Sequence, residues 1–206
     1  MSVVITPRTR QALIDAVEGI DLMRLTEAAA TIDYAKVDIL AAYQPVVLHF
    51  MDVATMMTYE NFAAAAAMVF GFLDERVRLV HLEDGRNEDV AEIANAASTR
   101  WDIELLEIGM VADAFGGRLS PTSLLLHFCN PDRYAWWNEE AFAFAVGREP
   151  YAGELDDLEL YGAYLEHMRG LATSIQAQQI TKLVRVVSPE ITRMGAVQVV
   201  LYAAGR

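Results

Sequence analysis

The chain contains 206 residues, of which 54% are hydrophobic and 22% are charged, and its formal net charge is -13. This composition is typical of a folded globular protein and excludes an intrinsically disordered one. The length is sufficient for one domain with a sizeable core. Because the negative charge repels a phosphate backbone at long range, nucleic-acid binding requires a local basic face, and DNA is a disfavoured partner.

Cysteine content and hydropathy bear on the cellular compartment. Cys129 is the only cysteine, which excludes an internal disulfide and a multi-cysteine zinc site. The most apolar run covers residues 62–73 and is shorter than the roughly 20 residues that a membrane-spanning helix needs. The first residues lack the basic, apolar and small-residue pattern of a secretory signal. We therefore expect a cytoplasmic protein with no membrane partner.

Helix caps and periodic apolar positions predict helices along nearly the whole chain. The expected helices cover residues 7–18, 22–43 with a break near 31–33, 45–57, 59–73, 87–98, 101–115, 120–129, 138–146, 155–174 and 189–203. Three of them begin with a hydroxyl N-cap followed by a proline at the first helical position, namely Thr6–Pro7, Ser120–Pro121 and Ser188–Pro189. Thr58 is the expected N-cap of the helix at 59–73.

The remaining segments leave alternatives open. Residues 75–84 either continue the preceding helix or follow a bend, and residues 183–187 fit a short strand or a helix equally well. The segment at 147–157 combines glycine, proline and charge without periodicity, so it is the best candidate for a hinge. The predicted fold is all-α, a compact multi-helix domain over residues 1–206, with two lobes at 1–98 and 99–206 as an alternative.

Most chemical motifs are missing from the sequence. The four histidines are far apart and form no short-spaced metal-binding pair: His49, His81, His127 and His167. No glycine-rich phosphate loop, serine-centred elbow or Cys-His pair is present. We therefore predict no metal site and no cofactor.

The second half of the chain contains one ordered succession of elements. A helix ends at residue 115, a tight turn follows at Gly116 and Gly117, and the next helix ends in Leu-His-Phe at 126–128. A proline-containing turn at 130–134 then leads to Asn138, the N-cap of another helix. This order resembles the bacterial members of the helix-hairpin-helix DNA glycosylase superfamily. In that family a glycine-containing hairpin precedes a helix ending in a similar triplet, and a turn leads to a capping aspartate.

The resemblance implies a two-lobed helical scaffold and places Asn138 at the catalytic aspartate of the family. It covers the second half of the chain well and the first half only as generic helices. Asparagine caps a helix as well as aspartate does, but it lacks the negative charge that stabilises an oxocarbenium-like sugar. The hairpin region also contains no lysine for a Schiff-base nucleophile, and Arg118 stands where a second glycine is expected. The resemblance therefore implies a pseudoenzyme without base-excision activity.

The candidate binding residues surround this turn: Gly116, Gly117, Arg118, Arg133, Trp136 and Trp137. The tryptophans either stack on an extruded base or, as we favour, lie one in the core and one partly exposed at the helix start. Cys129 is interpreted as a small buried hydrophobic residue.

Two functional hypotheses follow. The first is a glycosylase-like helical protein that binds DNA, a nucleotide or a protein partner without excising bases. The second is an acidic all-α interaction or regulatory subunit, a homo-oligomer included, unrelated to DNA repair. The positions of Arg118, Arg133 and Arg148 discriminate between them, because a DNA-binding surface needs these arginines on one face with the hairpin.

Overall fold

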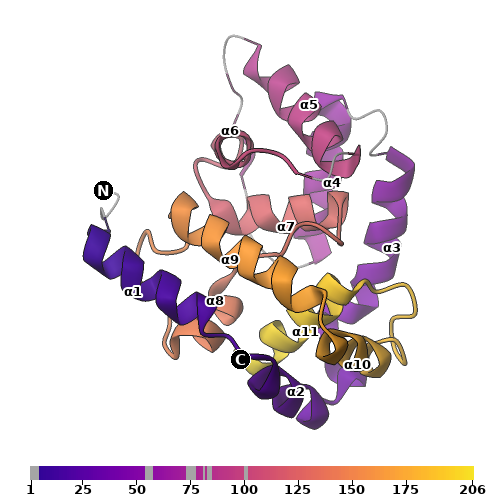
Figure 1. Ribbon diagram of the computed structural model, residues 1–206. Helices are drawn as coiled ribbons and strands as arrows, with labels where there is room; N and C mark the ends of the chain where they lie inside the picture. Colours follow the sequence, from indigo (N-terminus) through magenta and orange to yellow (C-terminus); the bar gives the residue numbers. More distant parts are fainter. Residues whose placement is uncertain (1–4, 54–57, 73–77, 81, 83–84, 100–101) are drawn as a thin grey trace.

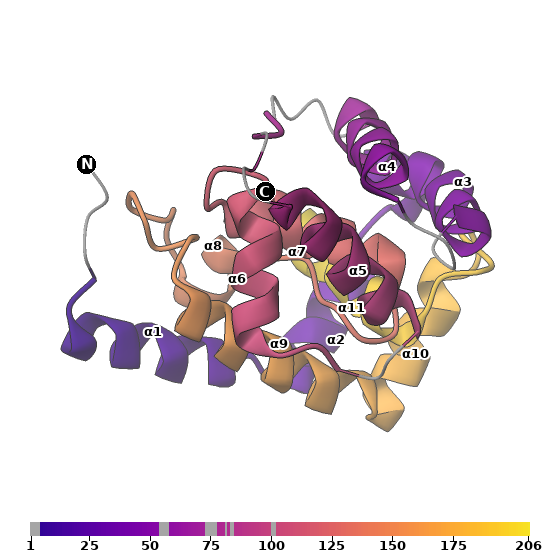
Figure 2. The same ribbon diagram turned by 90° about the horizontal axis from the view of Figure 1, so that it is seen from above.

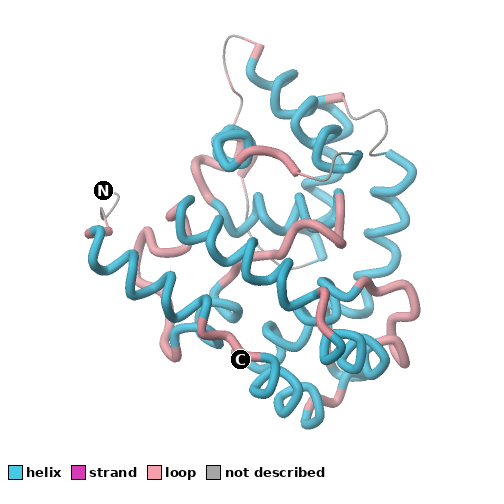
Figure 3. The backbone as a smooth tube through the Cα atoms, in the orientation of Figure 1, coloured by secondary structure: helices cyan, strands magenta, loops and turns pink. Residues whose placement is uncertain are grey.

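The computed structural model describes residues 5–53, 58–72, 78–80, 82, 85–99 and 102–206, and every regular element within these ranges is a helix (Figures 1 and 3). The prediction of an all-α fold is confirmed. The helices are α1 (Pro7–Glu18), α2 (Leu22–Thr31), η1 (Tyr34–Lys36), α3 (Asp38–Val53), α4 (Tyr59–Phe72), α5 (Arg86–Thr99), α6 (Leu105–Asp113), α7 (Leu119–Cys129), α8 (Glu139–Val146), α9 (Leu158–Ala172), α10 (Ile175–Val184) and α11 (Arg193–Ala204). None of the described helices is long and apolar enough to cross a membrane.

One of the three predicted cap-proline pairs begins a helix as expected. The Thr6 hydroxyl accepts a hydrogen bond from the Thr9 N–H, and Pro7 is the first residue of α1. The other two predictions are wrong. Ser120 and Pro121 lie inside the first turn of α7, because the Leu119 N–H is already bound by the Asp156 carboxylate at 3.1 Å. Ser188 and Pro189 form a turn before α11, whose N-cap is Thr192.

Two further helix boundaries differ from the prediction. The expected break after α2 is present, but Pro45 lies within α3 instead of beginning a helix. Pro45 and Ala41 are exposed, so the carbonyl group left without its N–H partner faces water. The candidate strand at 183–187 is also wrong, since Leu183 and Val184 end α10 and a turn follows.

The segment proposed as a hinge, residues 147–157, is instead held by polar contacts. Arg148 binds Glu154 through two hydrogen bonds of 2.7 Å, and the Tyr151 N–H donates to the same carboxylate. Asp157 caps α9 and accepts a hydrogen bond from Arg10 of α1 at 2.7 Å. Of residues 75–84, only 78–80 and 82 are described, and they are not helical.

The helices pack as two groups that share one continuous hydrophobic core. One group contains α3 to α7 and has α7 at its centre, with every residue of α7 buried. The other contains α1, α2 and α8 to α11, so the N-terminal helices pack against the C-terminal ones (Figure 2). A boundary at residue 98 therefore does not separate the packed groups. Gly109 of α6 beside Leu158 of α9 lets the two groups approach closely.

Candidate functional site

A tight glycine turn joins α6 to α7. Gly116 and Gly117 adopt φ angles of +68° and +81°, a region that favours glycine, and the Gly117 N–H donates to the Ala112 carbonyl at 2.9 Å. A Cβ atom at Gly117 would meet no heavy atom within 4 Å, so backbone conformation rather than close packing requires glycine there. The turn leaves Arg118 exposed at the start of α7.

Asn138 is the N-cap of α8, as the sequence predicts. Its backbone is extended, and its Oδ1 accepts a hydrogen bond from the Ala141 N–H at 3.0 Å. The helix ends at Gly147, which has a left-handed φ of +80°. Asn138 thus performs a structural task at the start of a short, well-capped helix.

Residues 134–137, which lie directly before Asn138 and outside any helix, are fixed by a hydrogen bond to each of their four carbonyl groups. The His127 ring nitrogen Nδ1 donates to the Tyr134 carbonyl, and the Tyr161 hydroxyl donates to the Ala135 carbonyl. The Tyr164 hydroxyl donates to the Trp136 carbonyl, and the Ser123 hydroxyl donates to the Trp137 carbonyl. Because the donors come from α7 and α9, both helix groups position the segment. No local sequence pattern predicts this set of hydrogen bonds. The reason is sequence separation: Tyr161 and Tyr164 lie 26 and 28 residues from the carbonyl groups that they bind, and no local pattern reveals such pairs.

Both tryptophans are buried, which corrects the expectation that one of them is partly exposed. Trp136 is 1% exposed and Trp137 is 0% exposed. The Trp137 ring packs on Tyr164 with centroids 4.5 Å apart, and the Trp136 ring meets the His127 ring edge-on at 4.7 Å. The fixed carbonyl groups before Asn138 hold the segment in the core, and both rings are buried with it.

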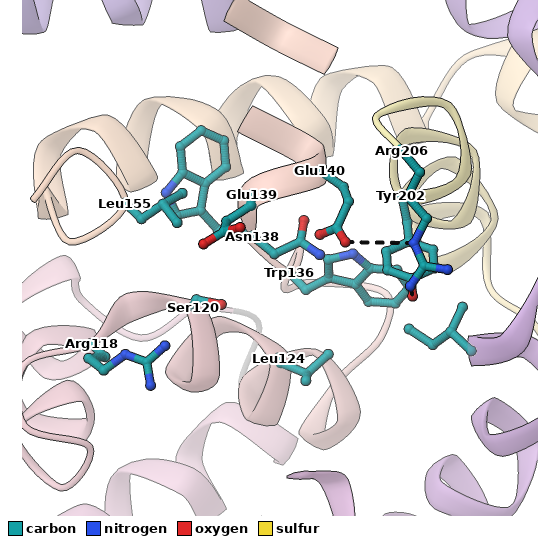
Figure 4. Close-up of a pocket in the computed structure, with 12 residues that line it drawn as sticks. Arg118, Ser120, Leu124, Trp136, Asn138, Glu139, Glu140, Leu155, Tyr202 and Arg206 are labelled. Atoms are coloured by element: carbon teal, nitrogen blue, oxygen red, sulfur yellow. Dashed lines mark hydrogen bonds and ion pairs between the residues drawn. The ribbon is translucent and has the colours of Figure 1, made fainter. Parts of the chain in front are cut away.

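A pocket of about 370 Å³ opens beside Asn138 (Figure 4). Its walls come from the start of α7, the segment leading into α8, the loop before α9, the start of α3 and the end of α11. The lining residues are Ile39, Arg118, Ser120, Leu124, Trp136, Trp137, Asn138, Glu139, Glu140, Leu155, Tyr202 and Arg206. The pocket thus unites four predicted site residues: Arg118, Trp136, Trp137 and Asn138.

The charged side chains of the pocket balance one another. Arg206 lies 3.1 Å from Asp38 and 3.7 Å from Glu140, so one wall is an ion-pair network. Glu139 is exposed, and the Arg118 guanidinium makes no ion pair with any described residue. Two arginines and two glutamates therefore line the pocket, with no net formal charge, in a chain of net charge -13.

Two buried donors at the pocket have no acceptor within the part of the chain that the structure describes. These are the Nε1–H groups of Trp136 and Trp137, whose side chains both line the pocket. An indole nitrogen only donates, and a buried donor without a partner costs roughly 1–3 kcal/mol. An acceptor atom of a ligand or of an ordered water would satisfy these donors.

The other predicted site residues lie elsewhere. Gly116 and Gly117 do not line the pocket. Arg133 lines a separate hollow of about 440 Å³ together with Arg169 and Arg193. Arg148 is bound to Glu154, whose pKa it holds below the ordinary value. The three arginines that discriminate between the hypotheses therefore do not meet in one site.

The histidines and Cys129 are the remaining candidates for metal or nucleophile chemistry. Within the described ranges, no three His, Cys, Asp or Glu side chains gather as metal ligands, and His81 lies outside the described residues. Burial raises the pKa of the Cys129 thiol to about 12, so the thiol stays protonated at neutral pH. This agrees with its interpretation as a small buried residue.

No sequence pattern predicts Ile39, Tyr202 and Arg206 as site residues. They line the pocket from the two ends of the chain, and the Tyr202 hydroxyl donates to Asp38 at 3.0 Å across 164 residues of sequence. A contact of such range leaves no pattern in one sequence.

Comparisons with protein-family models, with curated proteins and with solved structures give no match.

Proposed function

We propose that this chain is a binding protein on a scaffold like that of the helix-hairpin-helix DNA glycosylases, that it lacks base-excision activity, and that it takes a small ligand in the Asn138 pocket. The observation that carries the proposal is Asn138 itself. Its side chain caps α8 and lines the pocket, at the position where the resemblance puts a catalytic aspartate. Asparagine retains the cap and supplies no negative charge to an oxocarbenium-like sugar.

A small ligand is favoured over a DNA duplex because of the charge distribution. Arg118 and Arg133 line different hollows, and Arg148 is neutralised by Glu154. A duplex requires several cations along one face to offset a net charge of -13. The pocket, in contrast, needs no such face, since its own charges balance.

The test combines excision with duplex binding. We expect no release of base from duplexes carrying uracil or alkylated purines, and no affinity that rises as salt is lowered. Excision by the natural chain that is lost in Asn138→Ala contradicts the proposal. Asn138→Asp serves as the matched variant, because it changes the charge and keeps the cap.

A second candidate function is the acidic interaction subunit. The supporting observation is the group of exposed apolar side chains on α10 and the turn after it, where Ile175, Leu183, Val186 and Val187 face solvent and Val186 is 84% exposed. Such side chains are typical of a surface that a partner covers. Light scattering that gives a strict monomer, with no protein co-purifying, counts against this candidate.

A further inference from the structure

The orientation of the Asn138 amide determines what it offers to a ligand. The Ala141 N–H is a donor, so the atom that receives its hydrogen bond is the amide oxygen. The Nδ2 group is left to face the pocket, and it makes no hydrogen bond with any described residue. At the position of a family carboxylate, this chain therefore presents a donor.

Trp136 presents a second donor at the same place. Both residues line the pocket, and in the view of Figure 4 the Asn138 amide and the nitrogen-bearing edge of the Trp136 ring project onto the same part of its wall. The Trp136 Nε1–H is buried and finds no acceptor among the described residues. Two N–H groups on one pocket, neither with an acceptor among the described residues, match a ligand that brings an acceptor oxygen.

The charges around the two donors select an uncharged oxygen. Glu140 lines the same pocket and lies in the first turn of α8, so it repels a carboxylate or phosphate. Arg206 is already engaged by Asp38 and Glu140. Arg118, which makes no ion pair with any described residue, lies away from Asn138 and Trp136, across the pocket in Figure 4. A cationic ligand group would face the positive ends of the two N–H dipoles and would leave both donors without an acceptor. The apolar walls at Ile39, Leu124 and Leu155 suit an apolar ligand body.

We propose that Asn138 and Trp136 together bind one carbonyl oxygen of an uncharged amide or lactam in this pocket. The inference rests on the proposed binding function and deepens it by naming the ligand class. The amide carbonyl is a strong acceptor with two lone pairs, one for each N–H group.

The experiment uses the full chain with ¹⁵N-labelled tryptophan and follows the indole N–H signals by NMR. Three six-membered-ring probes differ mainly in charge: 2-piperidone, piperidinium and cyclohexanecarboxylate. We expect 2-piperidone to shift the Trp136 signal, which Trp136→Phe identifies by its loss, with a dissociation constant in roughly the millimolar range for so small a ligand. The two charged probes leave this signal in place.

Two variants make the test specific. Asn138→Asp keeps the cap and gives Trp136 an acceptor, so it weakens 2-piperidone binding about tenfold or more. Glu149→Gln is the control: it removes one exposed charge outside the pocket and changes the affinity less than about twofold. If 2-piperidone binds equally well to the natural chain and to Asn138→Asp, the inference that Asn138 and Trp136 together donate to its carbonyl oxygen is wrong.

The outcomes separate this inference from the proposed function. If the pocket binds piperidinium or cyclohexanecarboxylate more tightly than 2-piperidone, the inferred ligand class is wrong, whereas the proposed binding function still holds. No shift with any probe up to about 100 mM, well above the expected constant, also overturns the ligand class. The proposed function fails independently, through base excision or duplex binding by the natural chain.

Discussion

His127 illustrates how much one side chain contributes to the site. A carbonyl group only accepts, so the contact of 2.6 Å to the Tyr134 carbonyl places the proton on Nδ1. The Nε2 atom then accepts from the Tyr43 hydroxyl at 2.9 Å. The ring is thus neutral, fully buried and bound on both sides, and it ties α3 to the segment that carries Trp136 and Asn138.

The neutral state of His127 predicts a pH-dependent stability. Burial lowers its pKa to about 4, whereas an unfolded histidine titrates near 6.5. Below pH 6.5 the unfolded chain therefore binds a proton that the folded chain excludes, and stability falls until the pH reaches about 4. We expect this histidine to account for a loss on the order of 3 kcal/mol over that interval.

Urea unfolding at several pH values between 4 and 7 measures the effect. His127→Gln lowers stability at pH 7, because it disturbs a buried hydrogen-bonded position, and reduces the slope of stability against pH. The natural chain at the same pH values is the reference. Equal slopes for the two proteins would show that His127 does not carry the dependence.

At the scale of elements, the sequence predicts what local chemistry decides. Thr6 and Thr58 cap helices, Asn138 caps α8, and the turn at Gly116 needs a positive φ, and all four follow from nearby residues. Ser188 fails as a cap because Thr192, a few residues later, accepts the first-turn N–H instead. Two capping residues close together give the sequence no means to choose between them.

The contact between the end of α11 and the start of α8 belongs to what the sequence does not reveal. A Cβ atom on Gly205 would overlap the Glu140 carbonyl oxygen, so the two helix ends touch through backbone. Arg206 follows at once and reaches Glu140 and Asp38. The identity of one small residue thus positions the wall of the pocket.

Gly205→Ala tests this contact. The added methyl group must push α11 away from α8, and we expect a loss of about 1–3 kcal/mol, as for overpacking elsewhere. Gly170→Ala is the matched control: a Cβ atom at this exposed glycine of α9 meets nothing within 4 Å, and helix propensity favours alanine by up to about 1 kcal/mol. If the Tm values of both variants shift in the same direction relative to the natural chain, the close contact at Gly205 is contradicted.

At the scale of the whole molecule, the pocket depends on both ends of the chain. The N-terminal helices α1 and α2 pack against α8 to α11, and α3 supplies Tyr43 and Ile39 to the site. Residues with local motifs lie mainly in 116–138, whereas the walls that complete the pocket lie far away in sequence. The site is therefore a property of the complete fold.

A fragment of residues 99–206 tests this dependence. It keeps the turn, Asn138 and the tryptophans, but it loses Leu13 and Val17 of α1 and Leu25 of α2, all of which are buried in the shared core. Their removal exposes apolar surface of α8 to α11, and each lost core side chain contributes roughly 1.5–3 kcal/mol, a large part of the stability of a domain. We expect poor dispersion of its NMR signals and no cooperative thermal transition, with the full chain measured alongside. A dispersed spectrum and a sharp transition would instead show that the second half folds by itself and holds the site without α1 to α5.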